Sequence, residues 1–123
     1  MIAKEIKPGV TTLYLDKLAE QFIRDHGAEP AFLGMYGFPN SLCMSPNTQV
    51  VHGIPNNTPL QDGDIISVDC GAITPSGWNG DAAFSMVVPG GDPELMASRQ
   101  KVSDACEGSL WAGIAAFATA GAT

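Results

Sequence analysis

The stretch from Gly63 to Pro89 contains two apolar segments separated by a turn, and this pattern constrains the fold more than any other part of the chain. The first segment, Ile65 to Asp69, is rich in β-branched residues, and the second runs from Ala83 to Val88. Between them, Thr74 to Gly77 holds threonine, proline, serine and glycine, which favour turns. The pattern therefore predicts a β-hairpin.

Each predicted strand carries one acidic residue, and Asp69 and Asp81 are twelve positions apart. On paired antiparallel strands, two such residues can lie nearly opposite each other with their Cβ atoms about 5 Å apart. Carboxylates this close repel each other unless a cation or a shared proton lies between them. A divalent metal would remove the repulsion, so the pair is a candidate metal site. In the alternative interpretation, one aspartate caps a turn and the other faces solvent.

The segment from Pro30 to Gln61 contains no Asp, Glu, Lys or Arg but has five prolines, which forbid a continuous helix. Short strands are expected instead, at Ser41 to Met44 and at Gln49 to His52. The segment's apolar residues suit the lining of an apolar cleft, and ordinary core packing is the alternative. They are Phe32, Leu33, Met35, Tyr36, Phe38 and Cys43.

A first helix is predicted from about Thr12 to His26, with Thr12 as its N-cap and Gly27 as its left-handed stop. Apolar residues recur at helical spacing along it, while Asp16 belongs to the polar residues assigned to the other face. The apolar residues are Leu15, Leu18, Ala19, Phe22 and Ile23.

A second helix is predicted from about Pro93 to Ala116, because Asp92 is a good N-cap and proline is favoured at the first helical position. Glu107 is assigned to its polar face. The helix carries one apolar stripe over roughly six turns. This stripe consists of Leu95, Val102, Cys106, Leu110 and Ile114.

Composition limits the classes of protein that are possible. At 123 residues, 45% hydrophobic and 15% charged, the chain is expected to form one globular domain at most. A net charge of −7 and six scattered basic residues argue against a nucleic-acid partner. The longest apolar run, 108 to 123, has no charge but is too short for a membrane span. The three cysteines have no CxxC spacing, so free thiols in a reducing cytoplasm are expected.

Three motifs together closely resemble type I methionine aminopeptidases, which are metallopeptidases of family M24 with the pita-bread fold. The motifs are Val68-Asp69, Gly80-Asp81 and the run FPNSLCMSPNTQVVHGIP from Phe38 to Pro55. The resemblance extends from about Lys7 to Ala116 and covers the first half of the family's domain. It implies that residues 1–123 form a partial M24 domain of the α+β class, with a curved antiparallel sheet backed by two helices.

The resemblance also implies a metal site and a reaction. Members of the family remove the N-terminal methionine from nascent proteins in the cytoplasm, using two divalent metals (Co, Mn, Fe or Zn) that activate a water. Asp69 and Asp81 match two of the five metal-binding side chains. The other three, one His and two Glu, belong to the family's second half. The isolated chain is therefore expected to be nearly inactive and prone to self-association, whereas the complete domain is expected to be monomeric.

Further site residues follow from the same resemblance. His52, in the run Val51-His52-Gly53-Ile54-Pro55, matches a catalytic histidine that contacts the substrate and steadies the reaction's charge without binding metal. The pocket for the substrate's methionine side chain matches Met35, Phe38 and Cys43.

The chain departs from the family at several positions. The two acids are one position further apart than is common, and the extra residue is expected to lengthen the hairpin loop rather than shift the strand register. Asn79 stands where His is common, and Met35 and Phe38 stand where tyrosines are common. The alternatives are a non-catalytic peptide-binding module of the same fold and another M24 hydrolase, such as a proline-specific aminopeptidase.

Overall fold

The central strand of the fold is β3 (Ile65–Ile73), which belongs to a four-stranded antiparallel sheet. In the computed structural model, which describes residues 1–120, β3 pairs with β4 (Asn79–Val87) along its whole length. It also pairs with β2 (Leu42–Pro46) and with the two-residue strand β1 (Glu29–Pro30). This arrangement confirms the predicted α+β class.

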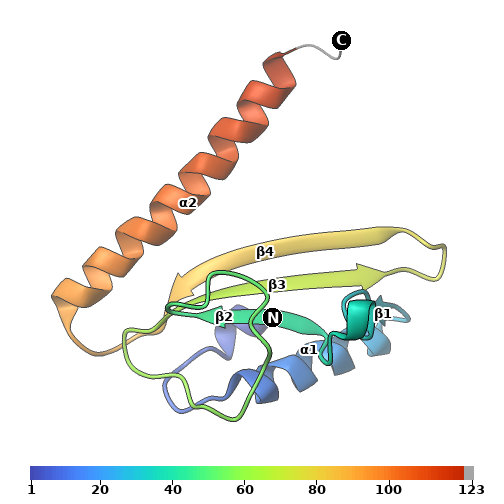
Figure 1. The fold of residues 1–123 in the computed structure, drawn as a ribbon, viewed down its shortest axis with the longest axis horizontal. Coiled ribbons are helices and arrows are strands. Elements are labelled where there is room, and N and C mark those ends of the chain that lie inside the picture. Colours follow the sequence, from blue (N-terminus) through green and yellow to red (C-terminus); the bar gives the residue numbers. More distant parts are fainter. Residues whose placement is uncertain (121–123) are drawn as a thin grey trace.

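Two helices flank this sheet (Figure 1). Helix α1 (Thr12–Asp25) lies along one face of the sheet, whereas α2 (Pro93–Thr119) follows β4 and extends away on the other side. Two short 3₁₀ turns complete the fold, η1 (Ile2–Lys4) before α1 and η2 (Met35–Gly37) before β2.

The predicted hairpin is confirmed, and both strands are longer than the apolar runs alone suggested. Pairing is continuous from Ile65 opposite Val87 to Ile73 opposite Asn79. Two backbone hydrogen bonds close the loop: the Thr74 N–H donates to the Trp78 carbonyl, and the Gly77 N–H donates to the Thr74 carbonyl. Gly77 has a positive φ of 84°, which favours glycine. The register is uninterrupted, so no bulge interrupts the strands between the two acids. That the loop takes up the additional residue stays a prediction.

The hydrophobic core lies between α1 and the sheet. Alternate residues of β2 and β3 point to this face and are almost completely buried, as strand geometry requires. Fully burying one such side chain is worth roughly 1.5–3 kcal/mol, so this cluster is the main source of stability. Its members are Ile2, Ile6, Leu15, Ala19, Leu42, Met44, Leu60, Ile66, Val68 and Val88.

The N-cap of α1 is one residue earlier than predicted. Thr11, not Thr12, is the N-cap, and its hydroxyl oxygen accepts a hydrogen bond from the Tyr14 N–H at 3.2 Å. The Thr12 hydroxyl is instead buried and exchanges hydrogen bonds with the backbone of Asn56. The predicted stop is confirmed, because Gly27 has a φ of 73° and its N–H donates to the carbonyl of Arg24.

Asp16 was assigned to the polar face of this helix, and that assignment is wrong. Its side chain points into the fold, and only 3% of the residue is exposed. One carboxylate oxygen accepts hydrogen bonds from the backbone N–H groups of Ser41 (2.9 Å) and Leu42 (2.8 Å). The other accepts from the Asn40 amide at 2.8 Å. The carboxylate therefore joins α1 to the start of β2.

The strand predicted from Gln49 to His52 is also wrong. This segment is a loop that begins at Asn47 (φ 53°) and ends at His52 (φ 55°), and neither angle is compatible with an extended strand. Val50 and Val51 have high β propensity, but no neighbouring strand covers them and both are exposed.

Helix α2 begins as predicted and continues to Thr119, three residues beyond the predicted end. The Asp92 side chain accepts a hydrogen bond from the Glu94 N–H, and Pro93 occupies the first turn. None of its residues 93–119 is buried, so the predicted apolar stripe is exposed to solvent. Within residues 1–120, no helix is both long and apolar enough to cross a bilayer. Residues 121–123 of the uncharged run at the C-terminal end lie outside the described part.

Asp16→Ala is expected to lower the free energy of unfolding by about 3 kcal/mol, since each buried donor that loses its partner costs roughly 1–3 kcal/mol. Asp16→Asn keeps one oxygen that can accept from both backbone N–H groups, so a loss of only about 1 kcal/mol is expected. Urea unfolding monitored by circular dichroism measures both changes.

Asp25→Ala is the matched control, because Asp25 lies on the same helix but is exposed, with its carboxylate bonded to the Gln21 side chain. It should change the stability by no more than about 0.5 kcal/mol. Equal losses for Asp16→Ala and Asp25→Ala would contradict the anchoring role of Asp16.

Candidate functional site

A cleft of about 710 Å³ lies on the face of the sheet opposite α1. Its floor is made by β2, β3 and β4, one wall by the loop from Val50 to His52, and the other wall by α2. The floor residues are Cys43, Ser45, Ser67, Asp69, Ala83, Phe84 and Ser85, and the α2 residues are Ser103, Cys106, Glu107, Leu110 and Trp111.

Asp69 and Asp81 lie on the same face of the hairpin. Asp69 is paired with Ala83 and Asp81 with Gly71, so the two acids are diagonal neighbours rather than directly opposite. Diagonal positions on one face remain within reach of each other's side chains. Between them, Gly71 contributes no side chain, and a Cβ atom there would collide with Phe32.

The two carboxyl groups interact electrostatically. Burial raises the pKa of Asp69, and the nearby charge of Asp81 and a hydrogen bond with its carboxyl group raise this pKa further. A charge on His52 acts in the opposite direction. Such a hydrogen bond requires a proton on one of the two acids, because ionised carboxylates are acceptors only. With both ionised, Asp69 Oδ1 is buried without any partner.

This donor set fits a divalent metal in part. Two adjacent carboxylates, one with an unpaired buried oxygen, offer the hard oxygen ligands and the negative charge that such ions prefer. Within residues 1–120, however, no group of three or more His, Cys, Asp or Glu side chains is arranged to hold an ion. The pair can therefore serve as one part of a metal site.

His52 reaches the same cleft from the loop after β2. The next residue, Gly53, is fixed to β2: its N–H donates to Ser45 Oγ at 3.0 Å, and its carbonyl accepts from the Met44 N–H at 2.8 Å. A Cβ atom on Gly53 would collide with the carbonyl oxygen of Met44. Only glycine therefore permits this close approach, which places the imidazole in the wall of the cleft above Asp69.

Of the predicted residues of the methionine pocket, Cys43 lines the cleft, whereas Met35 and Phe38 do not. Cys43 lies in the floor of the cleft and is paired with Asp69 across β2 and β3. Burial, and then the charges of Asp69 and Asp81, raise the pKa of the Cys43 thiol, which favours the neutral form. Met35 and Phe38 are not among the lining residues, since they lie in and after the η2 turn.

The sequence profile described as Metallopeptidase family M24 matches residues 1–123. The chain belongs to metallopeptidase family M24. Its membership agrees with the neighbouring carboxylates of Asp69 and Asp81 on the hairpin and with the cleft lined by Asp69 and His52.

Individual relatives are methionine aminopeptidases of bacteria. The chain is 47% identical over 111 residues to methionine aminopeptidase 1 of Mycobacterium tuberculosis, covering 89% of this chain and 40% of that protein. It is 52% identical over 83 residues to methionine aminopeptidase of Clostridium perfringens, covering 68% of this chain and 33% of that protein. These matches confirm the resemblance seen in the sequence motifs.

A solved structure shows the same similarity. The crystal structure of methionine aminopeptidase from Rickettsia prowazekii superposes with a TM-score of 0.74 at 41% identity, covering 80% of this chain and 40% of that chain. This M24 chain therefore spans well under half the length of these relatives.

One wall of the cleft in this M24 chain was not predicted from the sequence. Glu107 had been assigned to the polar face of the second helix, but it lines the cleft and accepts a hydrogen bond from Trp111 Nε1 at 3.3 Å. In the sequence, only the spacing of four residues indicates that Glu107 and Trp111 can contact each other on a helix. In contrast, Cys70 behaves as strand alternation requires and packs against the core on the α1 side.

Gly53→Ala is expected to lower the free energy of unfolding by about 1–3 kcal/mol, because the added methyl group has no space and the loop must move away from β2. Gly108→Ala, in the middle of α2 with open space around it, should instead raise the stability by about 0.5–1 kcal/mol. Chemical unfolding of both variants provides the measurement. Changes of the same sign would contradict the close packing of the His52 loop.

Asp81→Asn is expected to lower the Asp69 pKa toward its ordinary value, because it removes a neighbouring charge and leaves an amide that can donate to Asp69. Carboxyl ¹³C NMR titration of the metal-free chain measures this pKa, and Asp104→Asn on α2 serves as a control without effect.

The pH dependence of stability follows from the same shift. Since folding raises the Asp69 pKa, the folded chain holds that proton more tightly than the unfolded chain does. The resulting stabilisation is present below the ordinary pKa of aspartate and is lost as the pH rises through the raised value. This loss should be smaller in Asp81→Asn, and an unchanged profile would contradict the coupling of the two acids.

Proposed function

We propose that this chain contributes one half of the active site of a methionine aminopeptidase, which removes the N-terminal methionine from nascent proteins in the cytoplasm. The observation that carries the proposal is that Asp69 and Asp81 lie together on one face of the hairpin, next to a cleft that is lined by Asp69 and by His52 from the neighbouring loop. Membership of a metallopeptidase family supports it.

In this proposal Asp69 and Asp81 hold divalent metal ions, two in the complete site, chosen from Co, Mn, Fe and Zn. Bound metals supply an activated water as nucleophile and polarise the peptide carbonyl. The free Oδ1 of Asp69 supports the assignment, because a buried carboxylate oxygen without a partner is unfavourable unless a ligand occupies it. One further His and two Glu would come from outside the described residues.

The remaining residues of the cleft bind and orient the peptide. The His52 imidazole would hydrogen-bond to the substrate near the scissile bond and steady the charge that develops there. The neutral thiol of Cys43 and the apolar side chains of the two walls would contact the methionine side chain. Met35 and Phe38 belong to this proposal through the resemblance alone, since neither lines the cleft.

A second candidate function is a peptide-binding module without catalysis. The observation that favours it is the absence of a three-residue metal-binding group within residues 1–120, although the cleft itself is formed. In both cases the N-terminal methionine of a polypeptide is the proposed ligand.

Calorimetric titration of the 123-residue chain with Mn²⁺ or Co²⁺ tests the proposal. Weak binding is expected, with a Kd on the order of 10⁻⁴–10⁻³ M, because two carboxylates provide only part of a coordination sphere. Asp69→Ala and Asp81→Ala should each abolish the binding. Asp104→Ala removes an exposed carboxylate on α2 and should leave it unchanged.

Cleavage of a peptide with N-terminal methionine is measured on the same samples. No turnover by the chain alone is expected, and turnover would contradict the half-site. Metal binding that survives Asp69→Ala would overturn the assignment of the ligands. Binding of a Met-peptide without metal would favour the peptide-binding module.

A further inference from the structure

The shape of the cleft depends on the position of α2, which has few attachments to the rest of the fold. None of its residues 93–119 is buried, yet Ser103, Cys106, Glu107, Leu110 and Trp111 form one wall of the cleft. Two glycines, Gly90 (φ 105°) and Gly91 (φ 86°), precede α2, and because glycine adopts many conformations, contacts of the helix itself are needed to hold its direction.

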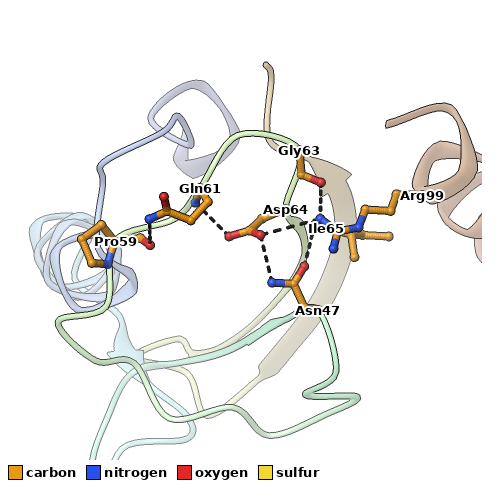
Figure 2. Close-up of polar contacts among 7 residues, drawn as sticks. All are labelled: Asn47, Pro59, Gln61, Gly63, Asp64, Ile65 and Arg99. Atoms are coloured by element: carbon orange, nitrogen blue, oxygen red, sulfur yellow. Dashed lines mark hydrogen bonds and ion pairs between the residues drawn. The ribbon is translucent and has the colours of Figure 1, made fainter. Parts of the chain in front are cut away.

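Arg99 attaches the first third of α2 to the turn that leads into β3 (Figure 2). Its guanidinium lies 3.6 Å from an Asp64 carboxylate oxygen and also donates a hydrogen bond to the carbonyl of Gly63. Both side chains are mostly shielded, with 25% of Arg99 and 15% of Asp64 exposed, so water screens the pair less than a surface pair. A second, longer bond joins Ser103 Oγ to the Ser85 carbonyl at 3.4 Å.

The same Asp64 carboxylate also attaches the loop that carries His52. Figure 2 shows Asn47 donating from its amide to the oxygen that faces Arg99, at 2.9 Å. Asn47 is also bonded to β3, because its N–H donates to the Ile65 carbonyl and its side-chain oxygen accepts from the Ile65 N–H. The other oxygen of Asp64 accepts the Gln61 N–H at 2.8 Å.

Asn47 is the first residue after β2, and the loop to His52 starts from it. One carboxylate therefore connects the two walls of the cleft, the His52 loop through Asn47 and α2 through Arg99.

We propose that Asp64 and Arg99 are positioning residues that set the separation between the α2 wall and the His52 wall of the cleft. Trp111 lies twelve residues, or about 18 Å, further along α2 than Arg99. A rotation of α2 by about 10° at Arg99 would therefore move this wall by roughly 3 Å. The importance of that distance for catalysis rests on the proposed function, whereas the positioning itself does not.

One guanidinium nitrogen of Arg99, Nη1, contacts both the Gly63 carbonyl and the Asp64 carboxylate, and the long arginine side chain carries it there. Lysine has a point charge and would satisfy both acceptors less well. Arg99→Gln removes the charge and most of the fork, so α2 should lose its fixed direction, and Arg99→Lys should have an intermediate effect.

Paramagnetic relaxation tests the positioning without metal or substrate. A nitroxide is attached to Cys106, which is exposed, whereas burial raises the pKa of Cys43 and of Cys70 and slows their reaction. The label should broaden the amide signals of Val50, Val51 and Gly53 across the cleft. Because Cys106 lies seven residues, or about 10.5 Å, beyond Arg99, the same rotation of about 10° would move the label by roughly 2 Å. The paramagnetic effect falls with the sixth power of distance, so this shift should reduce the broadening measurably.

Arg24→Gln is the matched control, because Arg24 pairs with Glu20 on α1, remote from the cleft. We expect broadening equal to the wild type in Arg24→Gln, reduced broadening in Arg99→Gln and an intermediate value in Arg99→Lys. The β3 amide chemical shifts report whether each variant is folded. If Arg99→Gln does not fold, the broadening in the milder variant Arg99→Lys tests the positioning role.

Broadening that stays at the wild-type level in folded Arg99→Gln and Arg99→Lys would overturn the positioning role. The metal titration of the wild-type chain is an independent experiment. If the wild-type chain binds no metal, the proposed function is overturned, whereas the positioning of α2 by Asp64 and Arg99 is not affected.

Discussion

The hydrogen bonds of the Asp16 carboxylate are the contact on which the rest of the structure depends. They hold the backbone N–H groups of Ser41 and Leu42, where the proline-rich segment becomes β2. Once this point is fixed, strand alternation places Leu42 and Met44 in the core and Cys43 and Ser45 in the cleft. A shift of β2 by one residue would exchange these two sets. The buried acid therefore acts together with the pairing of β2 and β3 to set which side chains of β2 reach the candidate site.

The two faces of the sheet have different roles, because one packs in the hydrophobic core and the other forms the floor of the cleft. The α1 side carries the buried apolar cluster, and the opposite side carries polar and acidic residues, including a pair of serine hydroxyls, Ser67 and Ser85, 2.7 Å apart. The hairpin that carries Asp69 and Asp81 has nine consecutive paired positions, and this pairing holds the two acids together against their repulsion. Such a rigid support is suited to holding two like charges close together until a cation or proton joins them.

Local patterns in the sequence were sufficient for the elements whose causes are local. The hairpin, the Asp92 cap and the Gly27 stop each depend on residues within a few positions, and all three are confirmed. The buried role of Asp16 was missed because the backbone groups that it binds are 25 and 26 positions away in the chain. The partner of Asp64, Arg99, is likewise 35 positions away, so no local pattern indicates their contact. The strand predicted at 49–52 failed for a related reason, since β propensity says nothing about whether a partner strand is available.

The backbone conformation of His52 has a consequence for how this chain can be altered. A φ of 55° is unfavourable for a histidine by about 1–3 kcal/mol and is favourable for glycine. Selection of variants for thermal stability alone would therefore tend to replace His52 by Gly or Asn, and would empty the wall of the cleft while improving the fold. Engineering of this scaffold has to hold position 52 constant, because a residue whose replacement relieves backbone strain is also the one that gives the cleft its imidazole.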